Sequence, residues 1–207
     1  MMGLWLKRKD WRSHRGFMKK AFTLLEVFVL FFIFILIAFI VIPISIDDTN
    51  QVKHISNWKS TNTHLLNLFS TLNINNYDTK QFEQQIVESF NEPFEAKIKP
   101  YKILYLNGDK PDNNFIFENL YKTKSNKVLG FKWFKGKNDT LYGLVMYDIN
   151  GKKRPNVWGK DVFGFSIDKN QIEPLCQKES LEILRSDCSK YGRGICCSYY
   201  YIIGGDF

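Results

Sequence analysis

The feature that most constrains this chain is an apolar run near its amino end. No side chain from Val27 to Ile42 is polar, and the apolar character extends back to Phe22 and forward to Ile46. As a helix, these roughly 25 residues would extend about 37 Å, more than the about 30 Å of a bilayer's hydrocarbon core. The run therefore predicts a membrane-spanning helix over residues 22–46.

Basic residues cluster on the amino-terminal side of this run. Residues 1–21 contain one acidic side chain, Asp10, and the basic side chains Lys7, Arg8, Lys9, Arg12, Arg15, Lys19 and Lys20. The net charge of +8 is therefore mostly a property of this segment, and the rest of the chain is nearly neutral. Because basic flanks stay in the cytoplasm, we expect a cytoplasmic amino terminus and an exported remainder. A nearly neutral exported part gives no indication of a nucleic-acid surface.

Two details separate the run from a cleaved secretory signal or an ordinary signal anchor. The sequence that follows it, IVIPISIDDTN, lacks the small-residue pattern of a signal-peptidase site. At its other end, Glu26 places a carboxylate where a charge is costly unless it is partnered or lies at the interface. We therefore expect the run to stay in the mature protein and Glu26 to have a function.

The residues around Glu26 resemble the signal of a known family. The sequence KKAFTLLE at residues 19–26, followed by the long apolar helix, resembles the prepilin signal of type IV pilins and type II secretion pseudopilins. Pro43 stands where many of these helices carry a proline. One departure is Ala21, at a position where the family usually has glycine.

This resemblance implies processing by a prepilin peptidase. The enzyme would cut between Ala21 and Phe22 and methylate the new amino terminus at Phe22. Residues 1–21 would then be the leader peptide, and the true start of the chain would be either Met1 or Met18.

The resemblance also implies how the helix would assemble. Glu26 would pair with the positive amino terminus of a neighbouring subunit, a contact that fixes register in an otherwise apolar filament core. The alternative is a solvated Glu26 at the level of the lipid headgroups. Pro43 lacks a backbone N–H and would bend or open the helix.

A second helical pattern follows the apolar run. Over residues 47–78, apolar side chains recur at steps of three and four, at Val52, Ile55, Trp58, Leu65, Leu66, Phe69 and Leu72. This spacing predicts an amphipathic helix with one face on a globular domain. It would continue the apolar helix as one long, bent helix from residue 22 to about 74, or form a separate short helix after a loop.

Residues 79–207 are expected to form an exported β-rich domain that ends in a disulfide region. The sequence predicts a short helix at Lys80–Phe90 and strands at Tyr101–Leu106, Asn114–Leu120, Val128–Phe134, Leu141–Asp148, Val162–Ile167 and Ser198–Ile203. Asn107-Gly108, Lys135-Gly136 and Asn150-Gly151 fit tight returns between strands. The fold class is therefore α+β, with a long helix packed on an antiparallel sheet in a pilin-like architecture.

Oxygen-bearing side chains gather in the Gly-rich stretch between two of these strands. Asp148, Asn150, Asn156 and Asp161 are ligands of the kind that calcium prefers, and some pseudopilins hold a structural calcium in their carboxy-terminal loops. The spacing does not match an EF-hand. Asn150-Gly151 is also an ordinary turn signal, so the stretch is either a calcium site at Asp148, Asn150 and Asp161 or a set of turns.

The four cysteines, Cys176, Cys188, Cys196 and Cys197, all lie near the carboxyl end, in the part expected to be exported. Disulfides persist there, and a bond between adjacent cysteines would strain the chain. Cys176 and Cys188 should therefore each pair with one member of the adjacent pair, in either combination. No histidine lies close in sequence, which disfavours a zinc site.

The sequence shows no catalytic motif and needs no cofactor. Its histidines, His14, His54 and His64, lie in the leader or on the predicted helix. We therefore expect a structural subunit of a type IV pilus or secretion pseudopilus. It would move from the inner membrane into a periplasmic or extracellular filament. Its partners would be other subunits, the prepilin peptidase and the assembly machinery in the membrane. The alternatives are a minor, DNA-uptake or adhesive pilin with a ligand-binding domain, and a monomeric signal-anchored domain.

Overall fold

The fold is α+β, with an apolar helix near the amino end and an antiparallel sheet in the carboxy-terminal part. The computed structural model describes residues 23–71, 79–90, 94–135, 141–168 and 171–206. The chain divides into two compact units, Met1–Ser45 and Ile46–Phe207, each described here by itself. The expected cleavage site, Ala21 and Phe22, lies outside the described residues.

The helix α1 runs from Leu24 to Thr71. The segment Leu24–Val41 has a mean hydropathy of 3.2 and is long and apolar enough to cross a membrane, as the sequence predicted. Pro43 lies inside the helix, so no loop separates the apolar part from the amphipathic part. The bend expected at Pro43 stays a prediction.

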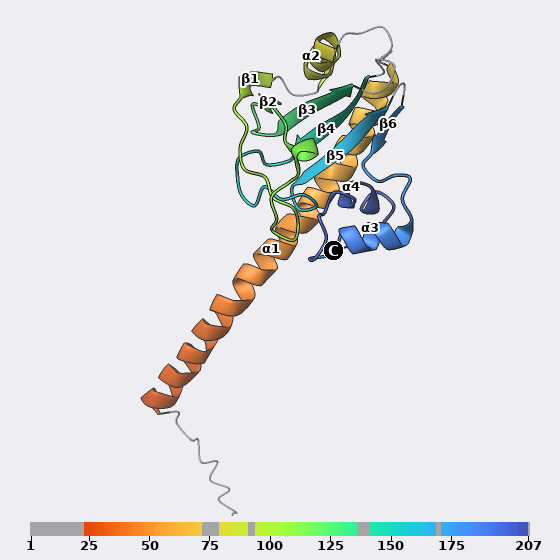
Figure 1. Cartoon of the computed structure of the whole chain (residues 1–207). Coiled ribbons are helices and arrows are strands. Elements are labelled where there is room, and N and C mark those ends of the chain that lie inside the picture. Colours follow the sequence, from red (N-terminus) through yellow and green to blue (C-terminus); the bar gives the residue numbers. More distant parts are fainter. Residues whose placement is uncertain (1–22, 72–78, 91–93, 136–140, 169–170, 207) are drawn as a thin grey trace, which may run out of the picture. The chain divides into compact units, whose positions relative to one another are not determined.

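Six strands form one antiparallel sheet in which each strand pairs with the next along the chain (Figure 1). The strands are β1 (Phe94–Ile98), β2 (Asn119–Thr123), β3 (Val128–Lys135), β4 (Leu141–Asp148), β5 (Val162–Asp168) and β6 (Gln171–Pro174). Asp148 is the partner of Val128 on one side and of Val162 on the other. This register brings the β2–β3 turn and the β4–β5 loop to the same end of the sheet.

The second part of α1 packs on the sheet through the predicted apolar stripe. Trp58, Leu65 and Phe69 are buried, and their spacing places them on one helix face. The Trp58 ring stacks on Phe163 of β5 at 4.9 Å between ring centroids. Val52 lies off this face and is 68% exposed. Burial of these large side chains supplies most of the free energy that holds the helix to the sheet.

Within the described residues of the second unit, three short α-helices accompany the sheet. They are α2 (Thr79–Ser89), α3 (Leu181–Asp187) and α4 (Cys197–Tyr200). The helix α2 matches the short helix predicted at Lys80–Phe90 and buries Phe82, Glu83 and Ile86. Its Glu83 carboxylate accepts hydrogen bonds from Asn119 and Trp133 of the sheet.

Several strand predictions are wrong. The predicted strand Tyr101–Leu106 does not join the sheet, and its β-pairing is an isolated bridge from Leu104 to Val157. The edge of the sheet is β1, from which Pro100 separates this segment. The predicted strand Asn114–Leu120 overlaps the 3₁₀ helix η2 (Asn113–Phe115) instead. The strand β2 starts only at Asn119. The predicted strand Ser198–Ile203 is instead the helix α4 and the turns after it, since Cys196 and Cys197 are held by disulfides.

The predicted tight returns also differ from the structure. Asn107-Gly108 forms a turn, with the Gly108 N–H donating to the carbonyl oxygen of Tyr105 at 2.9 Å, but it joins no strands of the sheet. Asn150-Gly151 turns at the end of β4, and Gly151 has a φ of 63° that favours glycine. The chain then continues through a long loop to Val162. Gly136 lies outside the described residues.

Candidate functional site

The amino end of α1 is closed by a reciprocal pair of hydrogen bonds between Thr23 and Glu26. The Thr23 N–H donates to Glu26 Oε2 at 2.8 Å, and the Glu26 N–H donates to Thr23 Oγ1 at 3.3 Å. This geometry is a capping box, which satisfies backbone donors that a helix start would otherwise leave unpaired. Glu26 therefore has a partner within its own chain.

Sequence reasoning missed this role for Glu26. The signal was present, since a threonine followed three residues later by a glutamate, ahead of an apolar run, is the pattern of a capping box. In the second unit the structure adds a partner for Trp58, whose indole N–H donates to the Ser198 carbonyl oxygen. The predicted pairing of Glu26 with a neighbouring subunit stays a prediction.

The apolar part of α1 presents its side chains outward all around the helix. None of the residues from Leu24 to Val41 is buried, and Phe34 and Phe39 are 69% and 75% exposed. A helix that is apolar on every face is stable only when it is surrounded by lipid or by other apolar helices. This segment therefore requires a membrane or partner helices.

The structure brings the residues of the predicted calcium site together at one end of the sheet. Asp148 Oδ1 accepts from the backbone N–H of Asn150 at 3.1 Å and of Gly151 at 2.7 Å, and Asp148 Oδ2 accepts from the Tyr101 hydroxyl at 2.5 Å. Asp161 accepts from the backbone N–H groups of residues 156 and 157 at 2.8 and 2.7 Å. Both carboxyl groups are fully buried.

Burial also controls the protonation of these groups. It raises the pKa of Asp148 well above its ordinary value, and the neighbouring Asp161 raises that pKa further. Burial likewise raises the pKa of Asp161. The pKa of the Tyr101 hydroxyl is raised too, first by burial and then by Asp148. Burial therefore disfavours the charged form of both carboxyl groups, whereas the backbone N–H groups that donate to them favour it.

The carboxyl oxygens of this cluster accept hydrogen bonds from the loops around them. Each of the four carboxyl oxygens of Asp148 and Asp161 already accepts a hydrogen bond from the protein. Asn150 Oδ1 is the one buried side-chain oxygen of the cluster that lacks a partner. Calcium prefers six or more oxygen ligands, and within the described ranges no group of three acidic, histidine or cysteine side chains could hold a metal. These hydrogen bonds are of the kind that the turn interpretation requires, and the calcium site at Asp148, Asn150 and Asp161 stays a prediction.

Two disulfides organise the carboxy-terminal region. Cys176 is bonded to Cys196 at a sequence separation of 20, and Cys188 is bonded to Cys197 at a separation of 9. Cys176 and Cys188 thus each take one member of the adjacent pair, as the strain of a vicinal bond leads one to expect. Cys188 and Cys197 are buried in the main core.

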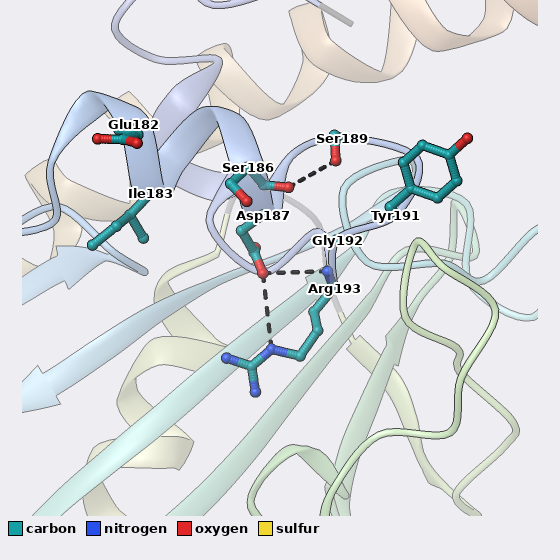
Figure 2. Close-up of a pocket in the computed structure, with 8 residues that line it drawn as sticks. All are labelled: Glu182, Ile183, Ser186, Asp187, Ser189, Tyr191, Gly192 and Arg193. Carbon is teal, nitrogen blue, oxygen red and sulfur yellow. Dashed lines mark hydrogen bonds and ion pairs between the residues drawn. The ribbon is translucent and has the colours of Figure 1, made fainter.

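Asp187 organises the loop between the disulfides. Its Oδ1 accepts from the Arg193 N–H at 3.2 Å and lies 3.8 Å from Arg193 Nε (Figure 2). Its Oδ2 accepts from the Cys196 N–H at 2.7 Å. These contacts leave both carboxylate oxygens engaged. The group therefore fixes the loop shape rather than serving as a catalytic base.

A surface groove of about 580 Å³ lies between α3 and this loop. Its rim includes Tyr191, which is 78% exposed, and Figure 2 shows the Tyr191 ring pointing away from the Asp187–Arg193 pair. The Ser189 hydroxyl donates to the Ser186 carbonyl oxygen at 2.8 Å, and no histidine is among the described residues that line the groove.

The chain matches no protein-family model, no curated protein and no solved structure.

Proposed function

We propose that this chain is a structural subunit of a type IV pilus or of a type II secretion-type pseudopilus. In this proposal, a prepilin peptidase removes residues 1–21 and methylates Phe22. The subunit then waits in the inner membrane and assembles into a filament through the apolar part of α1. The domain that follows is exported and forms the outer part of the filament.

The observation that carries this proposal is the exposed apolar segment Leu24–Val41. It belongs to the same helix, α1, whose second part is packed on an antiparallel sheet. A lipid-soluble helix that continues into a folded domain suits a subunit that is stored in a membrane and later packed against copies of itself. The leader residues 19–26 support the same proposal by resemblance.

Intact-mass measurement and amino-terminal sequencing of the mature protein test the proposal directly. We expect a chain that begins at Phe22 and carries one added methyl group. Cells that lack the prepilin peptidase should retain the uncut chain. An uncut chain in cells with an active peptidase would contradict the proposal.

A second candidate function is a monomeric extracytoplasmic domain held by a signal anchor. The capping box favours it, because Thr23 gives the Glu26 side chain a partner without any neighbouring subunit. The two functions differ in processing and in self-association. Crosslinking between copies through cysteines introduced at Leu30 and Phe34 should succeed only for a filament subunit.

A further inference from the structure

An apolar pocket of about 280 Å³ lies on the second unit. It opens between the segment that follows β1 and the 3₁₀ helix η2. Its apolar walls come from Tyr101, Ile103, Phe115, Ile116, Phe117 and Leu120. Ile116 is 45% exposed and extends the apolar surface beyond the pocket.

The walls are held in place by contacts behind them. The Phe115 ring lies edge-on to the buried Trp158 at 5.5 Å, and the Tyr101 hydroxyl is fixed on Asp148. Lys132 Nζ donates to the carbonyl oxygens of Asn113 and Ile116, which holds the turn that forms one wall. A pocket with walls fixed in this way loses little conformational entropy when it is filled.

The charge at the rim is positive. Lys102 and Lys110 line the pocket and both are exposed, and no carboxylate is among the described residues that line it. Of the acidic groups nearby in sequence, Asp112 forms an ion pair with Arg193 at 3.6 Å, while Asp109 accepts from the neutral amide of Asn107 at 2.8 Å and keeps its charge. The ammonium groups of the rim thus complement an anionic partner.

We propose that this pocket binds one large apolar side chain of a partner polypeptide in which the flanking residues are acidic. Small-molecule sites usually enclose roughly 300–1,000 Å³, so this pocket is at or below their lower limit. Its volume suits instead a single aromatic or aliphatic anchor of the kind that dominates protein interfaces. The two lysines select acidic neighbours of that anchor. The site is separate from filament assembly and does not depend on the apolar helix.

The test uses the full chain in nanodiscs of uncharged lipid, with ¹³C-labelled isoleucine and leucine methyl groups. The probe is a capped pentapeptide with a central phenylalanine between two glutamates. Ile103, Ile116 and Leu120 report on the pocket, while Leu181 and Ile183 of α3 report on a distant surface. We expect saturable shifts at the first three residues and none at the other two.

Charge reversal tests the rim. The double variant Lys102→Glu/Lys110→Glu should weaken binding of the acidic peptide about tenfold, given the modest strength of exposed ion pairs. The matched control is Lys152→Glu/Lys153→Glu, which makes the same change of net charge at two exposed lysines of the β4–β5 loop. This control should change affinity less than about twofold, because those charges do not line the pocket.

Three results would overturn the proposal. The first is an acidic peptide that leaves the pocket methyl groups unshifted. The second is equal binding when alanine replaces the central phenylalanine or lysines replace the glutamates. The third is free phenylacetate that binds as tightly as the peptide, which would make this a small-molecule site. None of these results bears on cleavage at Phe22, so the proposed function is tested separately.

Discussion

The indole N–H of Trp58 donates to the carbonyl oxygen of Ser198 at 2.7 Å, across 140 residues of sequence. The Ser198 hydroxyl in turn accepts from the backbone N–H of Gly164 in β5 at 3.0 Å. The residue Ser198 therefore connects the long helix to the sheet. Its neighbours Cys196 and Cys197 are each fixed by a disulfide, so the connection is rigid.

The substitution Trp58→Phe should destabilise the second unit by about 2–4 kcal/mol. It removes the hydrogen bond to Ser198, leaves a buried carbonyl oxygen without its partner and opens a cavity against Phe163. Thermal unfolding of the full chain in detergent measures the change. Val52→Ala is the control, because Val52 lies on the same helix and is 68% exposed. Equal melting temperatures for the two variants would contradict this role.

Glu83 is a second buried connection, between α2 and the sheet. Its carboxylate is 4% exposed and accepts from Asn119 Nδ2, the Tyr121 hydroxyl and Trp133 Nε1 at 3.1, 2.9 and 2.7 Å. Glu83→Ala should cost about 2–3 kcal/mol because it removes the buried acceptor of these half-buried donors. Hydrogen exchange should then accelerate throughout α2. Glu88→Ala, on the exposed side of α2, should leave that exchange unchanged.

The buried carboxyl groups of the β4–β5 loop give a prediction for pH. The pKa of Asp148 is raised in the folded state, chiefly by burial, so the folded protein binds a proton that the unfolded chain releases above its ordinary pKa of about 3.9. This contribution to stability is present below that value and declines as pH rises toward the folded pKa. Relative to Asp148→Asn, the wild-type protein should therefore lose stability as the pH rises above about 4. Urea unfolding at several pH values measures the difference, and a rise with pH would contradict it.

The two disulfides should contribute unequally to stability. In the loop-closure description, the bond from Cys176 to Cys196 closes the longer loop and should contribute about 0.7 kcal/mol more than the bond from Cys188 to Cys197. Paired serine variants of each bond, compared by urea unfolding, measure this difference. Peptide mapping of the oxidised protein identifies the pairing, and the crossed combination would contradict the structure.

Local sequence patterns were sufficient to predict the packed face of α1 and three of the strands. The spacing of Trp58, Leu65 and Phe69 predicted the packed face of α1, and runs rich in Tyr, Phe, Val and Ile located β3, β4 and β5. Strand propensity failed at Ser198–Ile203, where two disulfides and the contact with Trp58 impose helix and turn. The pocket beside Ile116 was also beyond prediction, because its walls come from segments that only the sheet brings together.

The last prediction concerns Glu26, whose charge and helix-capping role can be tested separately with two substitutions. Glutamine at this position can keep the capping contact with Thr23, since glutamine serves in a capping box, but it removes the charge. Thr23→Val does the opposite, because it removes the capping hydroxyl and leaves the carboxylate. Both variants should insert into the membrane normally.

If Glu26 pairs with the amino terminus of a neighbouring subunit, Glu26→Gln should enter filaments poorly while Thr23→Val enters nearly as well as the wild type. The reason is that an ammonium group left alone in an apolar core costs about 3–5 kcal/mol, whereas loss of the cap costs about 1 kcal/mol. The ratio of variant to wild-type subunit in sheared filaments, divided by the same ratio in the membrane, measures incorporation. Normal incorporation of Glu26→Gln together with poor incorporation of Thr23→Val would assign Glu26 to helix capping alone.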